Sequence, residues 1–144
     1  MNDEHIKVSI KNFLKNNSLT VIATVDEEKN RPECAVIAFA ETDKLELIFG
    51  TSNTTRKYKN IQKNKNVSFV IGWDGRIGTV QYEGVVRELS DTEAAERSEI
   101  LFLKNKQSAK FRSMSDQRYF LVTPTWIRLT DNTPGSAGVY EVSF

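Results

Sequence analysis

The spacing of the apolar segments is the feature that most constrains this fold. Short runs rich in β-branched and aromatic residues recur along the chain, most of them separated by gaps of hairpin length. The runs are residues 19–25, 31–40, 45–49, 67–73, 79–89, 119–122, 126–129 and 139–144. Antiparallel neighbours need only short turns, whereas parallel strands need crossover connections of a dozen or more residues. The pattern therefore predicts a mainly β fold, a small antiparallel barrel of about six strands with a few short helices.

Three segments have helical patterns instead. Ile6, Ile10 and Leu14 recur at a spacing of four residues, as one face of a helix requires. A short helix is predicted over residues 56–63. Ser90 can cap a third helix that runs to about residue 103, with a glutamate three residues on as in a capping box. The 144 residues suit one domain, and no linker divides them, so we expect residues 1–144 to form a single domain.

Composition excludes several classes of protein. Twenty basic and nineteen acidic residues give a net charge of +1, so an overall basic nucleic-acid-binding protein is not expected. The only cysteine and histidine, Cys34 and His5, cannot form an intramolecular disulfide or a His/Cys metal cluster, and Cys34 is expected to be buried in its strand. Neither a signal peptide nor a membrane-spanning run is present in the sequence. We therefore expect a cytoplasmic protein that binds neither nucleic acid nor membranes.

The near-neutral total conceals two oppositely charged segments. Residues 56–65 hold five basic residues and no acid, whereas residues 81–99 hold six acids against two arginines. The basic segment follows Gly50 and Thr51, and its helix begins at Arg56 and Lys57. Hydroxyl groups, helix N-terminal amides and two cations can together hold a phosphate. The alternative interpretation is a solvated basic helix face, with an ordinary turn hydroxyl at Thr51.

Several stretches resemble the FMN-binding split-barrel family related to pyridoxamine 5′-phosphate oxidase. The most specific are LELIFGT at 45–51, TTRKYKNI at 54–61 and NKNVSFV at 64–70. VIATVD at 21–26 and QYEGVV at 81–86 also fit, and the resemblance extends roughly from residue 13 to residue 129. It implies a six-stranded antiparallel split barrel of Greek-key type. It further implies a homodimer with FMN in grooves between the subunits.

Flavin-binding positions follow from the same resemblance. It implies that Thr51, Arg56 and Lys57, beside Gly50, meet the FMN phosphate or ribityl chain. The implied contacts along the isoalloxazine are Val36, Ile37 and Ala38. Thr79 or Gln81, two residues apart on one strand face, is implied to reach the polar edge of the flavin. Gln107 and Ser108 are similar to a flavin contact that the partner subunit supplies.

The sequence departs from the vitamin B6 oxidases at substrate-binding positions. Those enzymes carry a basic residue at each end of the second-strand motif, where this chain has Ala35 and Ala40, and their C-terminal Trp and Arg motif has no counterpart here. We therefore expect an FMN-dependent oxidoreductase of unknown substrate, without an assigned catalytic side chain, rather than an authentic pyridoxamine phosphate oxidase. The alternatives are a deazaflavin-dependent reductase and a non-catalytic flavin- or haem-binding stress protein.

Overall fold

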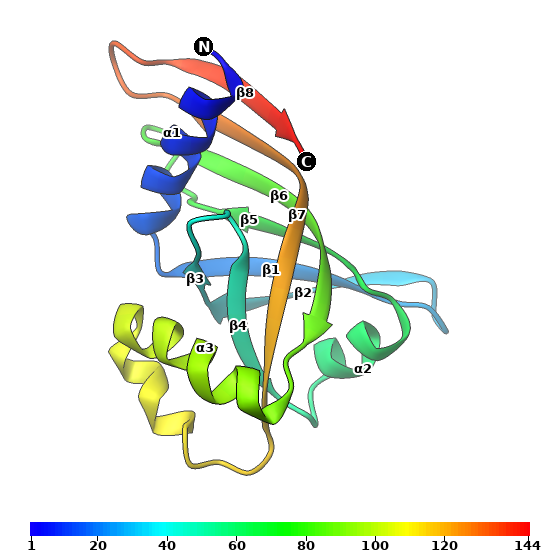
Figure 1. Ribbon diagram of the computed structural model, residues 1–144. Helices are drawn as coiled ribbons and strands as arrows, with labels where there is room; N and C mark the ends of the chain where they lie inside the picture. The colour runs from blue at the N-terminus through cyan, green and yellow to red at the C-terminus, as the bar shows by residue number, and fades with distance from the viewer.

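A single antiparallel sheet organises the computed structural model, which describes residues 1–144 (Figure 1). The strands follow the order β2-β1-β5-β6-β7-β4-β3, and β8 pairs with β7. Their bounds are β1 Leu19–Asp26, β2 Arg31–Ala38, β3 Ala40–Glu41, β4 Leu47–Ser52, β5 Asn66–Ile71, β6 Gly78–Glu88, β7 Gln117–Asp131 and β8 Gly138–Ser143. The predicted mainly β, antiparallel class is confirmed. The strand count differs, with eight strands in place of six.

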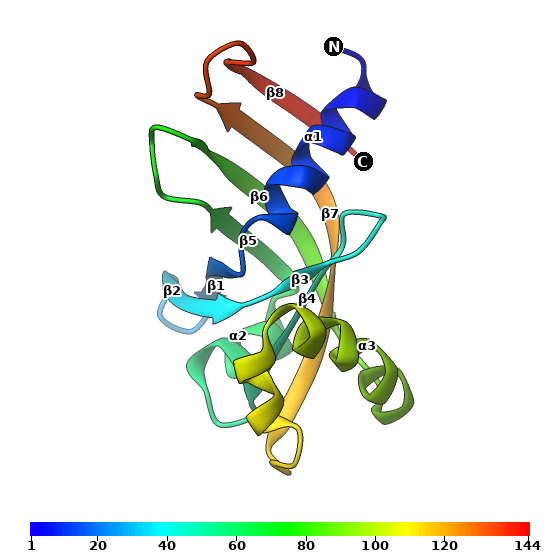
Figure 2. The ribbon, with the colours of Figure 1, turned by 90° about the vertical axis from the view of Figure 1, so that its left-hand side faces the viewer.

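The sheet curls because its two edges belong to one stretch of chain. β2 and β3 stand at opposite ends of the strand order, yet only Phe39 separates them in sequence. Phe39 is fully buried and interrupts the single strand predicted over 31–40. The first part of this stretch pairs with β1 and the second with β4, which draws the sheet into a half-barrel (Figure 2).

One long strand replaces the two short ones predicted on either side of Pro124. β7 pairs with β6 along its length, with β4 through its first half and with β8 through its second. The register shifts beside Gly84, which accommodates the proline because proline has no N–H to donate. A Cβ at Gly84 would lie 2.6 Å from the Thr123 carbonyl oxygen, so the close approach of β7 requires glycine.

Helices cover the open parts of the curled sheet (Figure 1). They are α1 Asp3–Lys15, α2 Arg56–Lys63, α3 Asp91–Lys104 and the short 3-10 helix η1 Lys106–Phe111. The predicted stripe of α1 is confirmed, since Ile6, Ile10 and Leu14 are buried. No helix combines the length and the apolar character that crossing a bilayer would require.

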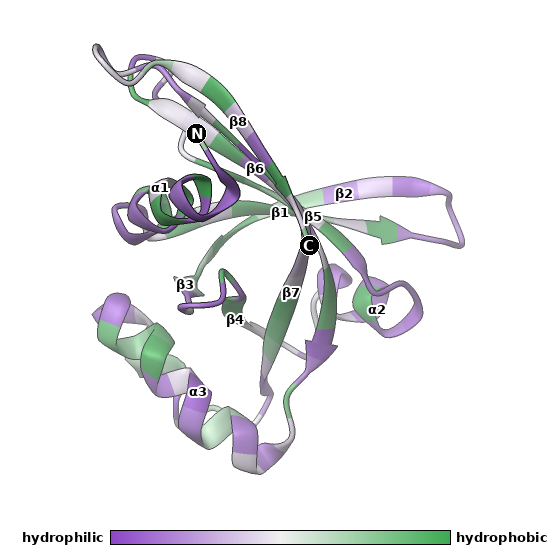
Figure 3. Cartoon of the chain, turned by 45° about the horizontal axis from the view of Figure 1, so that its top comes forward, coloured by the Kyte–Doolittle hydropathy of each residue, from purple (hydrophilic) through white to green (hydrophobic).

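Two separate cores hold these layers together. The larger lies inside the curl and includes Phe49 stacked on Phe120, with ring centroids 5.1 Å apart. The smaller core joins α3 to the sheet and comprises Ala40, Ile48, Leu89, Leu101 and Leu121. Figure 3 shows that the apolar residues of α3 gather in its second half. That half of the helix therefore packs on the sheet edge beside β3 and β4.

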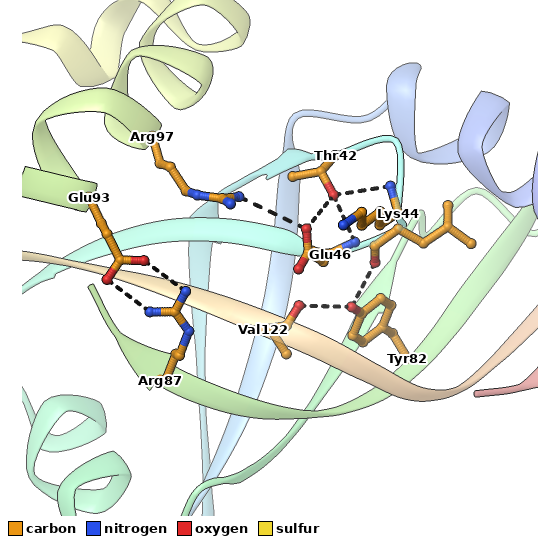
Figure 4. Close-up of polar contacts among 9 residues, drawn as sticks. Thr42, Lys44, Glu46, Tyr82, Arg87, Glu93, Arg97 and Val122 are labelled. Atoms are coloured by element: carbon orange, nitrogen blue, oxygen red, sulfur yellow. Dashed lines mark hydrogen bonds and ion pairs between the residues drawn. The ribbon is translucent and has the colours of Figure 1, made fainter. Parts of the chain in front are cut away.

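The first half of α3 is attached through polar contacts instead (Figure 4). Ser90 and Glu93 form the predicted capping box. Arg87 of β6 donates to both Glu93 oxygens at 3.1 and 2.8 Å. These hydrogen bonds, together with the one from the Ser90 backbone, lower the pKa of Glu93 to about 2. Arg97 lies 3.9 Å from Glu46 in the turn before β4. These contacts fix α3 relative to the strands beside it.

Candidate functional site

A hollow of about 350 Å³ opens between β2, β4, the start of α2 and the α3–η1 segment. Segments from five parts of the chain meet there, and seven of its thirteen lining residues are hydrophobic. The lining comprises Val36, Ile37, Ala38, Gly50, Thr51, Ser52, Lys57, Leu101, Phe102, Ser108, Phe111, Gln117 and Tyr119. Apolar walls with a few convergent polar groups are typical of cofactor and small-molecule sites.

Most of the positions implied by the family resemblance line this hollow. They are Val36, Ile37, Ala38, Gly50, Thr51 and Lys57, and Ser108 joins them. Arg56 lines a neighbouring hollow of about 260 Å³, and Lys57 belongs to both. Gln107, Thr79 and Gln81 are not among the lining residues of either hollow. Their contact with a cofactor stays a prediction.

Gln81 lies on the same face of the sheet as Val36, which lines the hollow. Residues paired across strands point to the same face, and the pairs run Val36–Val21, Val21–Val70 and Val70–Gln81. Three strand spacings separate Val36 from Gln81, or about 14 Å. This outer face is uncovered, and Val36 is 61% exposed on it. Cys34 is exposed on the same edge strand, so the expectation of a buried thiol was wrong.

The N-terminus of α2 supplies the polar end of the hollow. Thr55 caps the helix by accepting a hydrogen bond from the Tyr58 amide at 3.2 Å. The hydroxyls of Thr51 and Thr55 lie 3.1 Å apart, and Thr51 is buried. The first turn of the helix contains no acidic residue. The Tyr58 amide is occupied by the cap, but the amides of Arg56 and Lys57 and the partial positive charge of the helix end stay available to an anion.

Lys57 and Arg56 differ although they are adjacent in sequence. Lys57 forms no ion pair, and burial alone lowers the pKa of its ammonium group. Arg56 pairs with Glu33, whose Oε2 accepts from its Nη1 at 2.9 Å. A phosphate in the hollow would compensate the desolvation of the Lys57 ammonium. The unpaired lysine marks the end of the hollow where an anionic group fits.

Tyr119 of β7 also lines the hollow, beside Gly50, and no sequence motif pointed to it. A Cβ at Gly50 would lie 2.9 Å from its ring, so glycine makes room for the tyrosine beside the hollow. Its ring meets that of Phe102 edge to face at 6.0 Å. The buried Tyr119 hydroxyl has no hydrogen-bond partner, and burial raises its pKa. Buried polar atoms are rarely left unpaired, so this hydroxyl suits a ligand or water contact.

The donor set fits a flattened ring system that carries a phosphate. The walls from α3 and η1 offer Leu101, Phe102 and Phe111 to an apolar ring, and Thr51 and Lys57 offer donors to a phosphate. Haem suits the lining less well. None of the lining residues is His, Cys or Met, and Tyr119 is the one side chain among them of a type that ligates haem iron.

Comparison with known proteins identifies the family. A family model described as pyridoxamine 5′-phosphate oxidase matches residues 6–131. The chain therefore belongs to the pyridoxamine 5′-phosphate oxidase family, as the resemblance predicted. No curated protein matches the chain.

Solved structures share the fold at low sequence identity. General Stress Protein 26 from Bacillus anthracis is 17% identical with a TM-score of 0.75, covering 96% of this chain and 99% of its own. A heme binding protein from Mycobacterium smegmatis is 14% identical, with a TM-score of 0.78 and coverage of 95% and 57%. A FAD-binding protein from Mesorhizobium loti is 16% identical, with a TM-score of 0.67 and coverage of 83% and 90%. The chain spans 57% of the length of two of the structures it matches, the mycobacterial one among them.

Proposed function

We propose that this protein is a cytoplasmic, single-domain flavoprotein that binds FMN and acts as an oxidoreductase on an unknown small molecule. The observation that carries the proposal is the hollow with Lys57 at one end, unpaired and desolvated, and apolar side chains at the other. Membership of the family and the fold shared with a FAD-binding protein support a flavin. The alanines at 35 and 40 support a substrate other than pyridoxamine phosphate.

Each part of the lining has a distinct task in this proposal. Lys57, Thr51 and the α2 amides hold the phosphate, with Arg56 beside them. The backbone of Val36, Ile37 and Ala38 borders the isoalloxazine, and the α3–η1 side chains exclude water from its surface. FMN, when bound, supplies hydride transfer at its N5. The protein itself binds the cofactor and orients it, which agrees with the lack of a catalytic acid–base motif in the sequence.

We propose further that two copies associate through the outer face of β1, β2 and β5. Its exposed apolar residues include Leu19, Val36 and Val70. Exposed apolar patches of this kind mark interaction sites. A second copy on this face would cover the hollow from the side of Val36. It would also enclose Gln81 near a cofactor, the position the resemblance gives it.

The visible spectrum of the purified protein tests the cofactor. A yellow protein that releases FMN on denaturation is expected, and reduced nicotinamide should bleach it if the protein turns over. A colourless protein that binds no added FMN would overturn the proposal. Elution at about twice the chain mass in gel filtration tests the homodimer.

Haem binding is the second candidate, because a heme binding protein shares the fold. A Soret band of the protein after addition of haem would support this candidate. If the band were unchanged in Tyr119→Phe, Tyr119 would be excluded as the iron ligand, and it is the one side chain in the lining of a type that ligates haem iron. A deazaflavin is the third candidate. It would be recognised by identifying the chromophore that the denatured protein releases, which would then not be FMN.

A further inference from the structure

A buried polar network connects β2 to the first turn of α2. Glu33 accepts from Arg56 Nη1 through Oε2 and from Asn60 Nδ2 through Oε1, both at 2.9 Å. Asn60 also donates through Nδ2 to the Thr24 hydroxyl of β1 at 2.9 Å. The Glu33 side chain is 9% exposed and Asn60 is 8% exposed, whereas the Arg56 side chain is 74% exposed. The carboxylate is therefore fixed from inside the fold, and the guanidinium extends from it toward solvent.

The contact with Glu33 lowers the entropy that the Arg56 side chain loses when it binds a ligand. An exposed arginine loses rotamer freedom when it binds a ligand, and a guanidinium held in advance loses less. The contact with Glu33 is the only side-chain hydrogen bond of Arg56, and a guanidinium has five N–H donors. Its other donors remain available beside the hollow that Arg56 lines with Thr55 and Lys57.

The negative charge of Glu33 has an opposite effect, because a carboxylate near a phosphate repels it. Both Glu33 oxygens already accept hydrogen bonds, and Arg56 neutralises the charge at 2.9 Å. Lys57 has no acidic partner, so its charge is not offset in the same way. We therefore expect the gain from a fixed guanidinium to exceed the repulsion.

We infer that Glu33 is a positioning residue: held by Asn60, it fixes Arg56 beside Lys57 and so selects a phosphorylated flavin over the unphosphorylated form. The inference rests on the proposed function, because it assumes that the hollow binds a flavin. It adds that phosphate selectivity depends on a residue of β2 that acts through Arg56, although Glu33 itself also lines the neighbouring hollow.

Two variants test Glu33 through the dissociation constants of FMN and riboflavin, measured by flavin fluorescence on the full chain stripped of bound flavin. Glu33→Gln keeps the shape but replaces one of the two acceptor oxygens with an NH2 group, which cannot accept from Arg56 or Asn60. Glu33→Asp keeps the charge but withdraws the carboxylate by one methylene. Both variants should lower the preference for FMN over riboflavin roughly tenfold while riboflavin affinity stays unchanged. Having two variants keeps the test decisive if one fails to fold.

Glu28→Gln is the matched control, because Glu28 pairs with Lys63 of the same helix at an exposed site. It should leave both affinities unchanged. Tighter FMN binding by Glu33→Gln would overturn the inference and show that the carboxylate competes with the phosphate. An unchanged preference, or an equal loss of both ligands, would overturn it too, since a structural role affects both flavins alike. A wild-type protein that binds neither flavin would overturn the proposed function and this inference with it.

Discussion

The N-termini of α2 and α3 offer a comparison within one molecule. Both helices follow a strand, and both have a hydroxyl cap, Thr55 in one and Ser90 in the other. In α3 the positive end of the helix meets its own acids, because Asp91 and Glu93 occupy the first turn and Arg87 pairs with Glu93. In α2 the first turn holds two cations and no acid. Thus the first turn of α3 is balanced by its own acids, whereas in α2 Glu33 of β2 pairs with Arg56 and Lys57 has no acidic partner.

The largest effect should come from removing both cations of α2. Replacing Arg56 and Lys57 together with alanine should weaken FMN binding by about 3–6 kcal/mol, using about 1.5–3 kcal/mol for each charge-assisted contact. The fold should survive at reduced stability, because both side chains lie at the surface or in the hollow but the loss of Arg56 leaves the buried Glu33 carboxylate without its cation. Titration with FMN measures the loss of affinity, and circular dichroism checks that the variant is folded. Lys63→Ala on the same helix is the control, and an equal loss there would mean that general charge is sufficient.

A second, smaller effect should come from the contact between Gly50 and Tyr119, which both line the hollow. Gly50→Ala brings a Cβ to about 2.9 Å from the Tyr119 ring, so the ring must shift. Such overpacking costs about 1–3 kcal/mol of unfolding free energy. FMN affinity should fall as well. Urea unfolding measures the first effect, with Gly75→Ala as control because nothing lies within 4 Å of a Cβ there. Unchanged stability in Gly50→Ala would contradict the close contact.

The two caps test the comparison directly. Ser90→Ala and Thr55→Ala should each cost about 1 kcal/mol of stability, the usual value of an N-cap. Only Thr55→Ala should also weaken FMN binding, because Thr55 contacts Thr51 at the hollow. Thermal unfolding and FMN titration of both variants separate the two roles. Reduced FMN affinity in Ser90→Ala would show that α3 contributes more than a wall.

The smallest effect is the dependence on pH. Burial lowers the pKa of Lys57 in the empty protein, and a bound phosphate would raise it again. The Lys57 contribution to FMN affinity should therefore be complete below the Lys57 pKa of the unbound protein and be lost as pH rises from there through the higher pKa of the complex. Riboflavin affinity should not change with pH in this way, because riboflavin has no phosphate. In Lys57→Ala, FMN affinity should lose this pH dependence as well. The Glu93 pKa of about 2 means that the α3 contacts are lost only in strong acid, so they do not change in this range.

Local pattern was sufficient for most elements of the fold. The stripe of α1, the bounds of α2 and the capping box at Ser90 follow from neighbours within four residues, which interact directly on a helix. The break at Phe39 and the continuous strand through Pro124 could not be predicted in this way. Both depend on strand pairing between distant segments: β3 joins β4, and β7 carries an extra residue, Thr125, beside the proline where it pairs with β6.

The sequence by itself determined the class of fold, the basic segment at α2 and, through the family motifs, six of the thirteen residues that line the hollow. These depend on local spacing and residue type. Only the tertiary structure decided that Tyr119 faces Gly50, that Lys57 is unpaired and that Arg56 is held by Glu33. Such facts depend on which strands the curled sheet brings together. Adjacent residues with the same charge thus acquired different surroundings, which their sequence neighbours could not reveal.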